Sequence, residues 1–550
     1  MHEESFDYIV VGAGSAGAVV ATRLSEDPDV SVLLIEAGPE DRSYWTRLPL
    51  GFGKILFQDR YVPHHMSEPE AEMANRAIRL PYGSLLGGSS AINGLIYIRG
   101  ASWDYDQWQA LGAAGWSYKD VLPAFKKIER HYKGASAYHG DSGPFGVERA
   151  RWRNDVADAL LDAAQSLGVQ RNDDMNGATI EGCFYNELAT WNGRRSSTSL
   201  NYLEPNRHRT NFTIWTEAPV QRVDFEQHRA VGVTLRRDGA EIRVRARREV
   251  VLSAGALHTP KLLQLSGIGP GGLLQSQGIP IIADLQGVGS NLMDHLSFVC
   301  PFSTTSRDTF NKRVNSVGGL MREAFNYYLG KRDTPFAVGA GLAGMYTRSR
   351  PDVRTPDIQV GMAPFMPGAR GYDLAKDSGF FVGAFQCRPE SRGSVSITST
   401  DAAAPPRVAF NHLSTPLDVQ TSLDAMKFIL RIAGTGAFER VNAKLVAPLQ
   451  GASDDVLLDY IRSTSSTSFH YSGTARMGED PAAVVDPQLR VRGVSNLRVI
   501  DASVMPVVVS TNTNAATIMI GERGAEFIKR GAAHRPLRSV AAPQPELIDA

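Results

Sequence analysis

Residues 6–38 read FDYIVVGAGSAGAVVATRLSEDPDVSVLLIEAG, and this stretch decides the fold. The run from Tyr8 to Val11 is apolar and β-branched, as expected of a buried strand. A G-x-G-x-x-G turn and a helical pattern follow, and a second apolar run ends at Glu36. A strand, a glycine turn, a helix and a second strand with an acid about 20 residues beyond the glycines predict a dinucleotide-binding βαβ unit.

The three glycines and the acidic residue of this unit each have a physical role in holding a dinucleotide. Gly12 allows the tight turn, Gly14 lets the backbone approach a pyrophosphate, and Gly17 lets the helix pack close to the strand. The helix N-terminus offers free N–H groups and the positive end of the helix dipole to phosphate. Glu36 can accept hydrogen bonds from a ribose diol and disfavours a 2′-phosphate. The alternative is a glycine-rich turn of another α/β fold, which the position of Glu36 disfavours.

Length and composition exclude several classes of protein. The chain has 550 residues, more than one compact core holds, so two domains are expected. Basic and acidic residues both number 58, so there is no basic excess that would indicate a nucleic-acid partner. The three cysteines are far apart and form no CxxC, which predicts neither a disulfide framework nor a metal site; they are Cys183, Cys300 and Cys387.

The start of the chain and its hydropathy favour a cytoplasmic protein. MHEESFDY lacks the basic and apolar regions of a signal peptide. No run approaches the ~18 uninterrupted apolar residues of a membrane span. We therefore expect a small-molecule enzyme without a membrane span, in a reducing compartment.

Two further stretches have small residues where a cofactor would need close backbone approach. Residues 81–100, PYGSLLGGSSAINGLIYIRG, offer successive N–H groups, the Ser89 hydroxyl and the Asn93 amide to a polar ligand. The alternative there is a plain turn with a helix cap. After the apolar run 250–252, the turn 253–255 leads to a helix expected from Thr259 to Ser266, with Pro260 in its first turn.

The pattern along the chain predicts an α/β protein with a discontinuous first domain. Period-two segments from Asn211 onward return to the first sheet, whereas residues from about 296 to 455 alternate short strands and longer helices. We expect a Rossmann-like dinucleotide-binding domain and a second, α+β domain built on an antiparallel sheet; the family resemblance described below implies that the first binds FAD and the second the substrate. The first domain would comprise 1–155, 211–295 and 456–535, the second 156–210 and 296–455, and 536–550 would form a loosely ordered tail.

Two polar residues near the C-terminus are candidates for chemistry. His470 lies in a loop of small residues, and Asn514 starts the last helical pattern, among Thr511, Asn512 and Thr513. The alternative for the asparagines is a helix-capping role, which is stronger for Asn512 than for Asn514. A single histidine is more often structural than catalytic, and the sequence alone does not bring these two residues together.

The chain resembles the glucose–methanol–choline (GMC) oxidoreductases along nearly its whole length. The motifs that carry the resemblance are GAGSAG with Glu36, GSLLGGSSAINGLIYIRG, GALHTPKLLQLSGIG at 255–269, GVGSNLMDH at 287–295, and FHYSGTARMG together with NTNAATIMI. Within this family the chain is most similar in character to hydroxymethylfurfural and aryl-alcohol oxidases and to related alcohol dehydrogenases.

The resemblance implies bound FAD and an alcohol substrate. By position, His470 matches the catalytic histidine, which takes the hydroxyl proton as hydride leaves for flavin N5, and Asn514 matches its hydrogen-bonding partner. The implied FAD site comprises Gly12, Gly14, Ser15, Ala16, Gly17, Glu36, Ala37, Leu86, Gly88, Ser89, Asn93, Gly94, Ile96, Val220, Ala254, Phe469, Asp501, Ala502, Asn514 and Thr517.

Three positions depart from the family's common pattern. Ser84 replaces a residue that is often Arg, Lys or Asn, and Tyr471 replaces a frequent proline. Ile92 stands where some members tether FAD through a histidine, so non-covalent FAD is expected.

The substrate and the reaction leave alternatives open. The expected substrate is a primary alcohol, aryl or aliphatic, with O2 or another electron acceptor. The alternatives are a fatty-acid photodecarboxylase, suggested by the segment at Cys387 but disfavoured by His470, a hydroxynitrile lyase, and a flavin-binding protein without catalysis.

Overall fold

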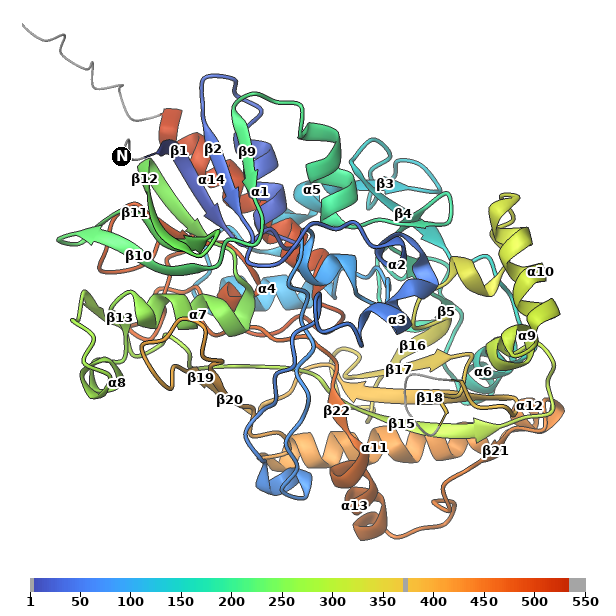
Figure 1. Cartoon of the computed structure of the whole chain (residues 1–550). Coiled ribbons are helices and arrows are strands. Elements are labelled where there is room, and N and C mark those ends of the chain that lie inside the picture. Colours follow the sequence, from blue (N-terminus) through green and yellow to red (C-terminus); the bar gives the residue numbers. More distant parts are fainter. Residues whose placement is uncertain (1–3, 369–373, 534–550) are drawn as a thin grey trace, which may run out of the picture.

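The computed structural model of the chain describes residues 4–368 and 374–533. Two seven-stranded sheets organise the molecule, one at the upper left of Figure 1 and one at its lower right. The expected loosely ordered tail, 536–550, lies outside the described residues.

The first sheet has a parallel core that extends into an antiparallel ribbon. Its strand order is β10-β11-β12-β1-β2-β9, and β23 pairs with β12. β23, β12, β1, β2 and β9 pair in parallel, whereas β10, β11 and the first half of β12 are antiparallel. The strands are β1 (Ser5–Val11), β2 (Val32–Ile35), β9 (Phe212–Trp215), β10 (Val220–Glu226), β11 (Arg229–Arg237), β12 (Ala240–Leu252) and β23 (Leu497–Val499).

The register of the parallel strands aligns their carboxyl ends. Val11 pairs with both Ile35 and Leu252, and Leu252 also pairs with Val499. The residues after these strands therefore meet at one edge of the sheet, where ligands bind in open α/β sheets. That edge receives the glycine turn after β1, Glu36 after β2, the 253–255 turn after β12, and Asp501 just beyond β23.

Helices from both ends of the chain cover this sheet. α1 (Gly17–Leu24) packs on β1 and β2, and its residues are almost all buried. α14 (Asn514–Ala533), the last helix, packs against α1 and against α5 (Tyr118–Ile128). The first and last thirds of the chain therefore share one core, as Figure 1 shows by the red helix beside the blue one.

The helix after β12 begins earlier than the sequence indicates. α7 spans Gly255–Leu265, so Pro260 lies inside it and not in its first turn. Proline lacks an N–H and leaves the carbonyl four residues earlier without its helical partner. Here the Ala256 carbonyl accepts a hydrogen bond from Thr474 Oγ1 at 2.7 Å. A tertiary contact thus satisfies the group that the proline leaves free, and the helix continues through it.

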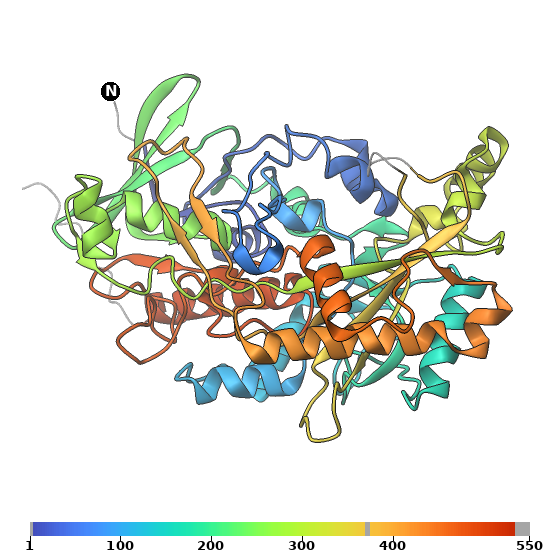
Figure 2. The ribbon, with the colours of Figure 1, turned by 90° about the horizontal axis from the view of Figure 1, so that it is seen from below.

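The second sheet is antiparallel throughout, with order β21-β15-β18-β17-β16-β5 and β22 paired to β15. α11 (Pro416–Ala433) packs along β17 and β18, and Figure 2 shows it crossing the sheet. α6 (Asp155–Ser166) packs on β16 and β5. The strands are β5 (Gly182–Tyr185), β15 (Leu296–Ser303), β16 (Ala343–Thr347), β17 (Ile358–Ala363), β18 (Gly379–Gln386), β21 (Lys444–Leu445) and β22 (Ser466–Thr467).

One expected domain boundary differs from the strand pairing. Residues from 456 onward were assigned by pattern to the first domain, but α13 (Asp454–Thr464) packs on α11 and β22 pairs with β15. The chain therefore leaves the second sheet only after Thr467. The pattern missed this because β22 has two residues and no periodicity of its own. The remaining boundaries stay a proposal.

Shorter elements fill the connections between the sheets. They are α2 (Tyr44–Arg47), α3 (Phe52–Ile55), the 3₁₀ turn η3 (Gly88–Ala91), α4 (Ser102–Ala110), α8 (Gly271–Ser276), α9 (Phe310–Val314), α10 (Val317–Tyr328), α12 (Gly436–Arg440), and the strands β3 (Glu129–His131), β4 (Phe145–Arg149), β6 (Glu187–Leu188), β7 (Thr190–Trp191), β8 (Arg194–Arg195), β13 (Ile268–Gly269), β14 (Ala283–Asp284), β19 (Ser394–Ser396) and β20 (Arg407–Ala409).

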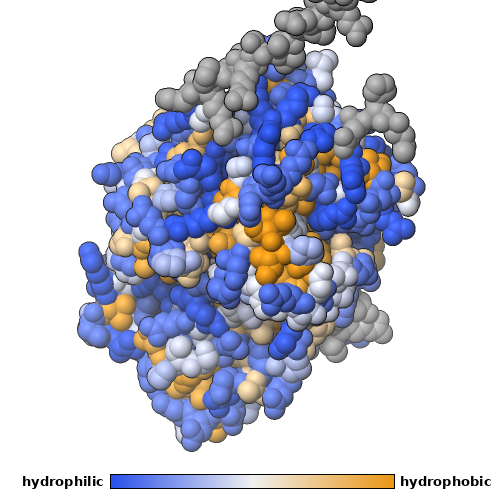
Figure 3. Space-filling view, turned by 90° about the vertical axis from the view of Figure 1, so that its left-hand side faces the viewer, coloured by the Kyte–Doolittle hydropathy of each residue, from blue (hydrophilic) through white to orange (hydrophobic). Residues whose placement is uncertain are grey.

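The surface carries an apolar stripe on α10. Val317, Met321, Phe325 and Tyr328 are each more than half exposed and recur at helical spacing, so they share one face. The side of the molecule near β10 and β11 is mostly hydrophilic, with a compact apolar area near its centre (Figure 3). Within residues 4–368 and 374–533, no helix is both long and apolar enough to cross a membrane.

Candidate active site

A cavity of about 650 Å³ opens at the carboxyl edge of the first sheet and reaches His470. Most of the residues expected at a dinucleotide site line it. These are Gly12, Gly14, Ser15, Ala16, Glu36, Ala37, Gly88, Ser89, Asn93, Gly94, Ile96, Val220, Ala254, Phe469, Asp501, Ala502, Asn514 and Thr517.

Two of the expected cofactor residues do not line the cavity. Leu86 is fully buried, and its N–H donates to the Pro39 carbonyl at 3.1 Å. Gly17 faces the glycine turn, where a Cβ would stand 1.9 Å from the Gly12 carbonyl oxygen. Gly17 therefore has the helix-packing role derived from its spacing, without direct contact with a ligand.

Glycine backbones from two segments form the floor of the cavity. Gly12 has φ +99°, and a Cβ there would lie 2.4 Å from the Ser253 carbonyl oxygen. A Cβ on Gly88 would lie 2.7 Å from the Cα of Gly14, so the two glycine turns touch through their backbones. Side chains at these glycine positions would fill the floor of the cavity. Because only backbone is present, the two turns and the N-terminus of α1 leave a cradle that fits a pyrophosphate.

Glu36 and Asp501 fasten the loops around this cradle. Glu36 accepts hydrogen bonds from the backbone N–H groups of Ala13 and Gly38, both at 2.9 Å. Burial raises the pKa of Glu36 to about 7. Asp501 accepts hydrogen bonds from Gly255 N–H at 2.9 Å and Thr259 Oγ1 at 2.6 Å. Each carboxylate therefore ties a strand end to the neighbouring turn.

His470 lines the cavity and is 5% exposed. Its Nε2 is 3.0 Å from the amide nitrogen of Asn512, and its Nδ1 is 2.8 Å from Nδ1 of His295. Its backbone N–H donates to the Asp294 carboxylate at 2.8 Å. Burial, and then the nearby His295, lower the pKa of His470 well below its usual value. The imidazole is therefore neutral at pH 7 and can act as a base.

The structure corrects the identity of the residue beside His470. Asn514, expected there, accepts a hydrogen bond from Ser15 Oγ at 2.7 Å and so joins the start of α14 to the glycine turn. Asn512, which the sequence favours as a helix cap, contacts His470 instead. The two asparagines alternate in the segment that enters α14, so their side chains leave it in different directions. Both line the cavity.

An aromatic residue of strained backbone borders His470. Phe469 has φ +64°, a left-handed conformation that is uncommon for a bulky residue. Its side chain lines the cavity and is 48% exposed. Tyr471, on the other side of His470, is buried and also lines the cavity. Because strained residues tend to occur at functional sites, this geometry supports His470 as the centre of the site.

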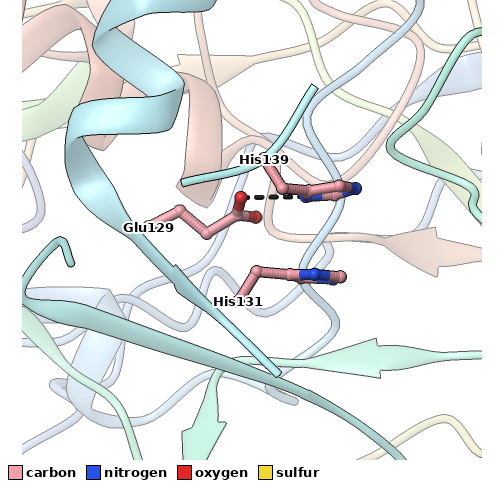
Figure 4. Close-up of side chains that lie close together, drawn as sticks. All are labelled: Glu129, His131 and His139. Carbon is pink, nitrogen blue, oxygen red and sulfur yellow. Dashed lines mark hydrogen bonds and ion pairs between the residues drawn. The ribbon is translucent and has the colours of Figure 1, made fainter. Parts of the chain in front are cut away.

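A separate cluster of Glu129, His131 and His139 has potential metal ligands within 4.8 Å of one another (Figure 4). The two imidazoles are stacked face to face, with centroids 3.7 Å apart, so their in-plane lone pairs do not converge. Glu129 forms an ion pair with the Arg99 guanidinium and a 2.9 Å contact with His139 Nδ1. The arrangement is a buried ion network. The Glu129 carboxylate, which a metal ion would need as a ligand, is already paired with the Arg99 guanidinium.

Comparison with known proteins assigns the family. Models of the GMC oxidoreductase family match residues 6–297 and 389–521. The chain belongs to this family, and it is an FAD-dependent alcohol oxidoreductase. FAD is accordingly the cofactor, and the glycine cradle and cavity described above fit it.

The relatives span several alcohol-oxidising enzymes. An oxygen-dependent choline dehydrogenase from Pectobacterium carotovorum is 39% identical over 96% of this chain and 95% of its own, and one from Rhizobium johnstonii is 38% identical over 95% of each chain. The crystal structure of pyridoxine 4-oxidase from Mesorbium loti superposes with a TM-score of 0.87 at 29% identity, covering 96% of this chain and all of that one. A fungal aryl-alcohol oxidase has a TM-score of 0.84 at 26% identity, covering 97% of this chain and all of that one.

Two residues of the site were not identified from the sequence. Asn512 stands two positions before Asn514, and only the direction of its side chain distinguishes the two. His295 is the last residue of the motif GVGSNLMDH, and the residue types of this motif do not by themselves indicate a function for the histidine. His295 directly precedes β15. Its contact with the loop that carries His470 becomes apparent only when β15 is seen to pair with β22, which directly precedes that loop.

Proposed function

We propose that this protein oxidises a primary alcohol, aryl or aliphatic, to the aldehyde, with His470 as the base and Asn512 as the hydrogen-bond donor to the substrate oxygen. The observation that carries the proposal is a neutral, buried imidazole that lines the cofactor cavity and whose Nε2 lies 3.0 Å from the amide nitrogen of Asn512. Bound FAD supplies the hydride acceptor.

The two side chains have complementary tasks in this reaction. The substrate hydroxyl approaches Nε2 of His470, displaces the Asn512 amide from that lone pair and gives up its proton there. The released amide N–H then donates to the substrate oxygen, which becomes more basic as the proton leaves. A general base positioned in this way contributes about 10²–10⁴-fold to the rate. The low pKa of His470 keeps it unprotonated and ready at neutral pH.

The charges around the cavity favour an uncharged alcohol. Among the described residues that line it, Glu36 and Asp501 are the carboxylates, and both are held by backbone N–H groups at the dinucleotide end. The lining residues on either side of His470 in the chain are the aromatic Phe469 and Tyr471, and the side chain that contacts its ring from the cavity is the uncharged amide of Asn512. A cationic substrate would find no carboxylate counter-charge there, so we infer an aryl or aliphatic alcohol without a charged head.

Choline is the second candidate, because choline dehydrogenases are among the relatives that match along almost the whole chain. A quaternary ammonium group could rest on aromatic faces, and Phe469 and Tyr471 would have to supply them. The two candidates share the primary hydroxyl and differ in the charge and shape of the group attached to it, so a comparison of substrates separates them.

A panel of alcohols tests the proposal. The holoenzyme is mixed anaerobically with benzyl alcohol, 1-hexanol and choline, and bleaching of the flavin is followed in the dark. Bleaching by the uncharged alcohols and not by choline is expected. Bleaching by choline alone reverses the substrate assignment. Fatty-acid turnover only under blue light, cyanide release from a cyanohydrin, or no response to any substrate would contradict alcohol oxidation and favour the decarboxylase, the lyase or a flavin-binding role.

Three further properties belong to the same proposal. FAD is held without a covalent bond, because Ile92 lines the cavity at the position of the tethering histidine. Parallel measurement of oxygen uptake and dye reduction identifies O2 or another acceptor. A cytoplasmic location is supported by the three cysteines, which are all buried and unpaired.

A further inference from the structure

We propose that His295 is a positioning residue that holds His470 in the tautomer with the hydrogen on Nδ1. This tautomer leaves Nε2, which faces the substrate, free to act as the base. The inference rests on the proposed alcohol oxidation and adds a residue that does not line the cavity. His295 is fully buried and touches His470 through a 2.8 Å contact between their Nδ1 atoms.

A chain of hydrogen bonds determines where each proton lies. Nε2 of His295 is 2.9 Å from the Cys387 carbonyl oxygen, which can only accept, so this nitrogen carries the hydrogen. A neutral imidazole carries one hydrogen, and Nδ1 of His295 is therefore a lone pair. Nδ1 of His470 must then donate to it. The remaining nitrogen of His470, Nε2, is left as a lone pair that accepts the Asn512 amide.

Both imidazoles are neutral, as this chain of bonds requires. Burial lowers the pKa of His295 to about 4, with the Cys387 carbonyl opposing this shift and Arg388 reinforcing it. A second hydrogen on His295 would place two N–H groups against each other. The Asp294 carboxylate lies beside the pair but binds the backbone N–H of His470, so it does not compete for the ring hydrogens.

The backbone holds the two rings at this distance. β15 begins at Leu296, directly after His295, and Leu296 pairs with Thr467 of β22. The Ser468 N–H donates to the His295 carbonyl at 2.9 Å, and Met293 and Ser472 exchange two backbone hydrogen bonds. His295 also stacks on Phe385 of β18, with centroids 4.6 Å apart. The His295 ring is therefore fixed by a strand ladder and by packing.

Proton uptake leaves this arrangement intact. When the substrate proton arrives at Nε2 of His470, the hydrogen on Nδ1 still points at the His295 lone pair. The imidazolium is thus stabilised by an acceptor that was already in place. Without that acceptor, the hydrogen of His470 can move to Nε2, and this nitrogen could then take no proton.

Two substitutions of His295 separate this role from packing. Both His295→Asn and His295→Gln remove the ring and its stacking on Phe385. The amide oxygen of Asn reaches the place of Nδ1 and can accept from His470. Gln carries its amide one carbon further out, near the place of Nε2, where it keeps the bond to Cys387 and leaves His470 without its acceptor.

The readouts are the rate of anaerobic flavin bleaching by benzyl alcohol, the FAD content, the unfolding midpoint, and imidazole nitrogen NMR of histidine-labelled protein. We expect His295→Asn to keep a rate within about threefold of the parent and His295→Gln to fall ~10- to 10³-fold, since a triad histidine in the wrong tautomer costs up to ~10⁴. The NMR spectrum should show the Nδ1–H tautomer of His470 in the parent and in His295→Asn, and loss of that state in His295→Gln.

Equal rates in the two variants, or an Nε2–H tautomer of His470 in the parent, would overturn the inference. If none of the alcohols bleaches the flavin of the parent protein, the proposed function fails. The tautomer measurement still decides the role of His295 in that case. If one variant does not fold, the inference is still tested by the NMR spectrum of the parent and by the rate of the other variant.

Discussion

The amide of Asn512 lies 3.0 Å from Nε2 of His470, whereas Asn514, two residues later, accepts a hydrogen bond from Ser15 at 2.7 Å. One asparagine thus faces the reacting end of the cavity and the other faces the glycine turn. This division predicts different consequences for two chemically identical substitutions.

Replacing Asn512 by alanine should slow flavin reduction by alcohol about 10- to 10²-fold, because the substrate oxygen loses a donor worth about 1.5–3 kcal/mol when charge develops on it. FAD content should stay near that of the parent. Stopped-flow bleaching at saturating alcohol measures the rate. Asn514→Ala is the matched control: it should weaken FAD retention and leave the rate of the loaded fraction within a few-fold. The reverse pattern would restore Asn514 as the partner of His470.

Replacing His470 by alanine should give a yellow protein that is no longer bleached by alcohol. The side chain contributes a base and no contact with the glycine cradle, so FAD stays bound while the rate falls about 10²–10⁴-fold. Absorbance of the purified protein reports FAD, and anaerobic mixing with the best alcohol reports the rate. A variant that reduces its flavin at a near-normal rate would show that another group removes the proton.

Replacing Glu36 by alanine should weaken FAD binding by about 10- to 10²-fold, the equivalent of losing hydrogen bonds to a charged group of about 1.5–3 kcal/mol. Two backbone N–H groups of the cradle also lose their acceptor. Equilibrium titration of the apoprotein with FAD measures the change. Glu36→Gln retains one acceptor oxygen and should lie between the alanine variant and the parent. Unchanged affinity in both variants would remove Glu36 from the ribose site.

The buried network around His139 should make the protein less stable at alkaline pH. Contacts with Asp174 and Glu129 outweigh desolvation and raise the pKa of His139 to about 9. The folded state therefore keeps a proton that the unfolded chain releases above its ordinary pKa of about 6.5. The stabilisation is complete below about pH 6.5 and is lost as the pH rises through about 9, at a cost on the order of 2 kcal/mol.

Thermal unfolding between about pH 6 and 10 measures this dependence, and His139→Asn should flatten it while lowering the midpoint at neutral pH. Addition of a chelator such as EDTA should leave the midpoint unchanged, because the network is closed by Arg99 and Asp174. A chelator-sensitive midpoint would instead identify Glu129, His131 and His139 as metal ligands.

Local pattern was sufficient for the dinucleotide-binding unit. The apolar run 8–11, the glycine spacing and Glu36 predict β1, α1 and β2, because a tight turn and close helix packing depend on glycine at particular positions. The helix after β12 was placed four residues late. A proline is compatible with a helix interior when another side chain satisfies the freed carbonyl, and Thr474, more than 200 residues away in the chain, does this for Ala256.

The sequence by itself determined the family, the cofactor, the parallel sheet and the histidine around which the site is built, since these depend on local spacing and on motifs. Only the tertiary structure decided which asparagine meets His470, that His295 stands behind it, and that the chain stays with the second sheet through Thr467. These features depend on the direction of side chains and on pairing between strands about 170 residues apart. Such long-range contacts leave no periodic signature in the residues that make them.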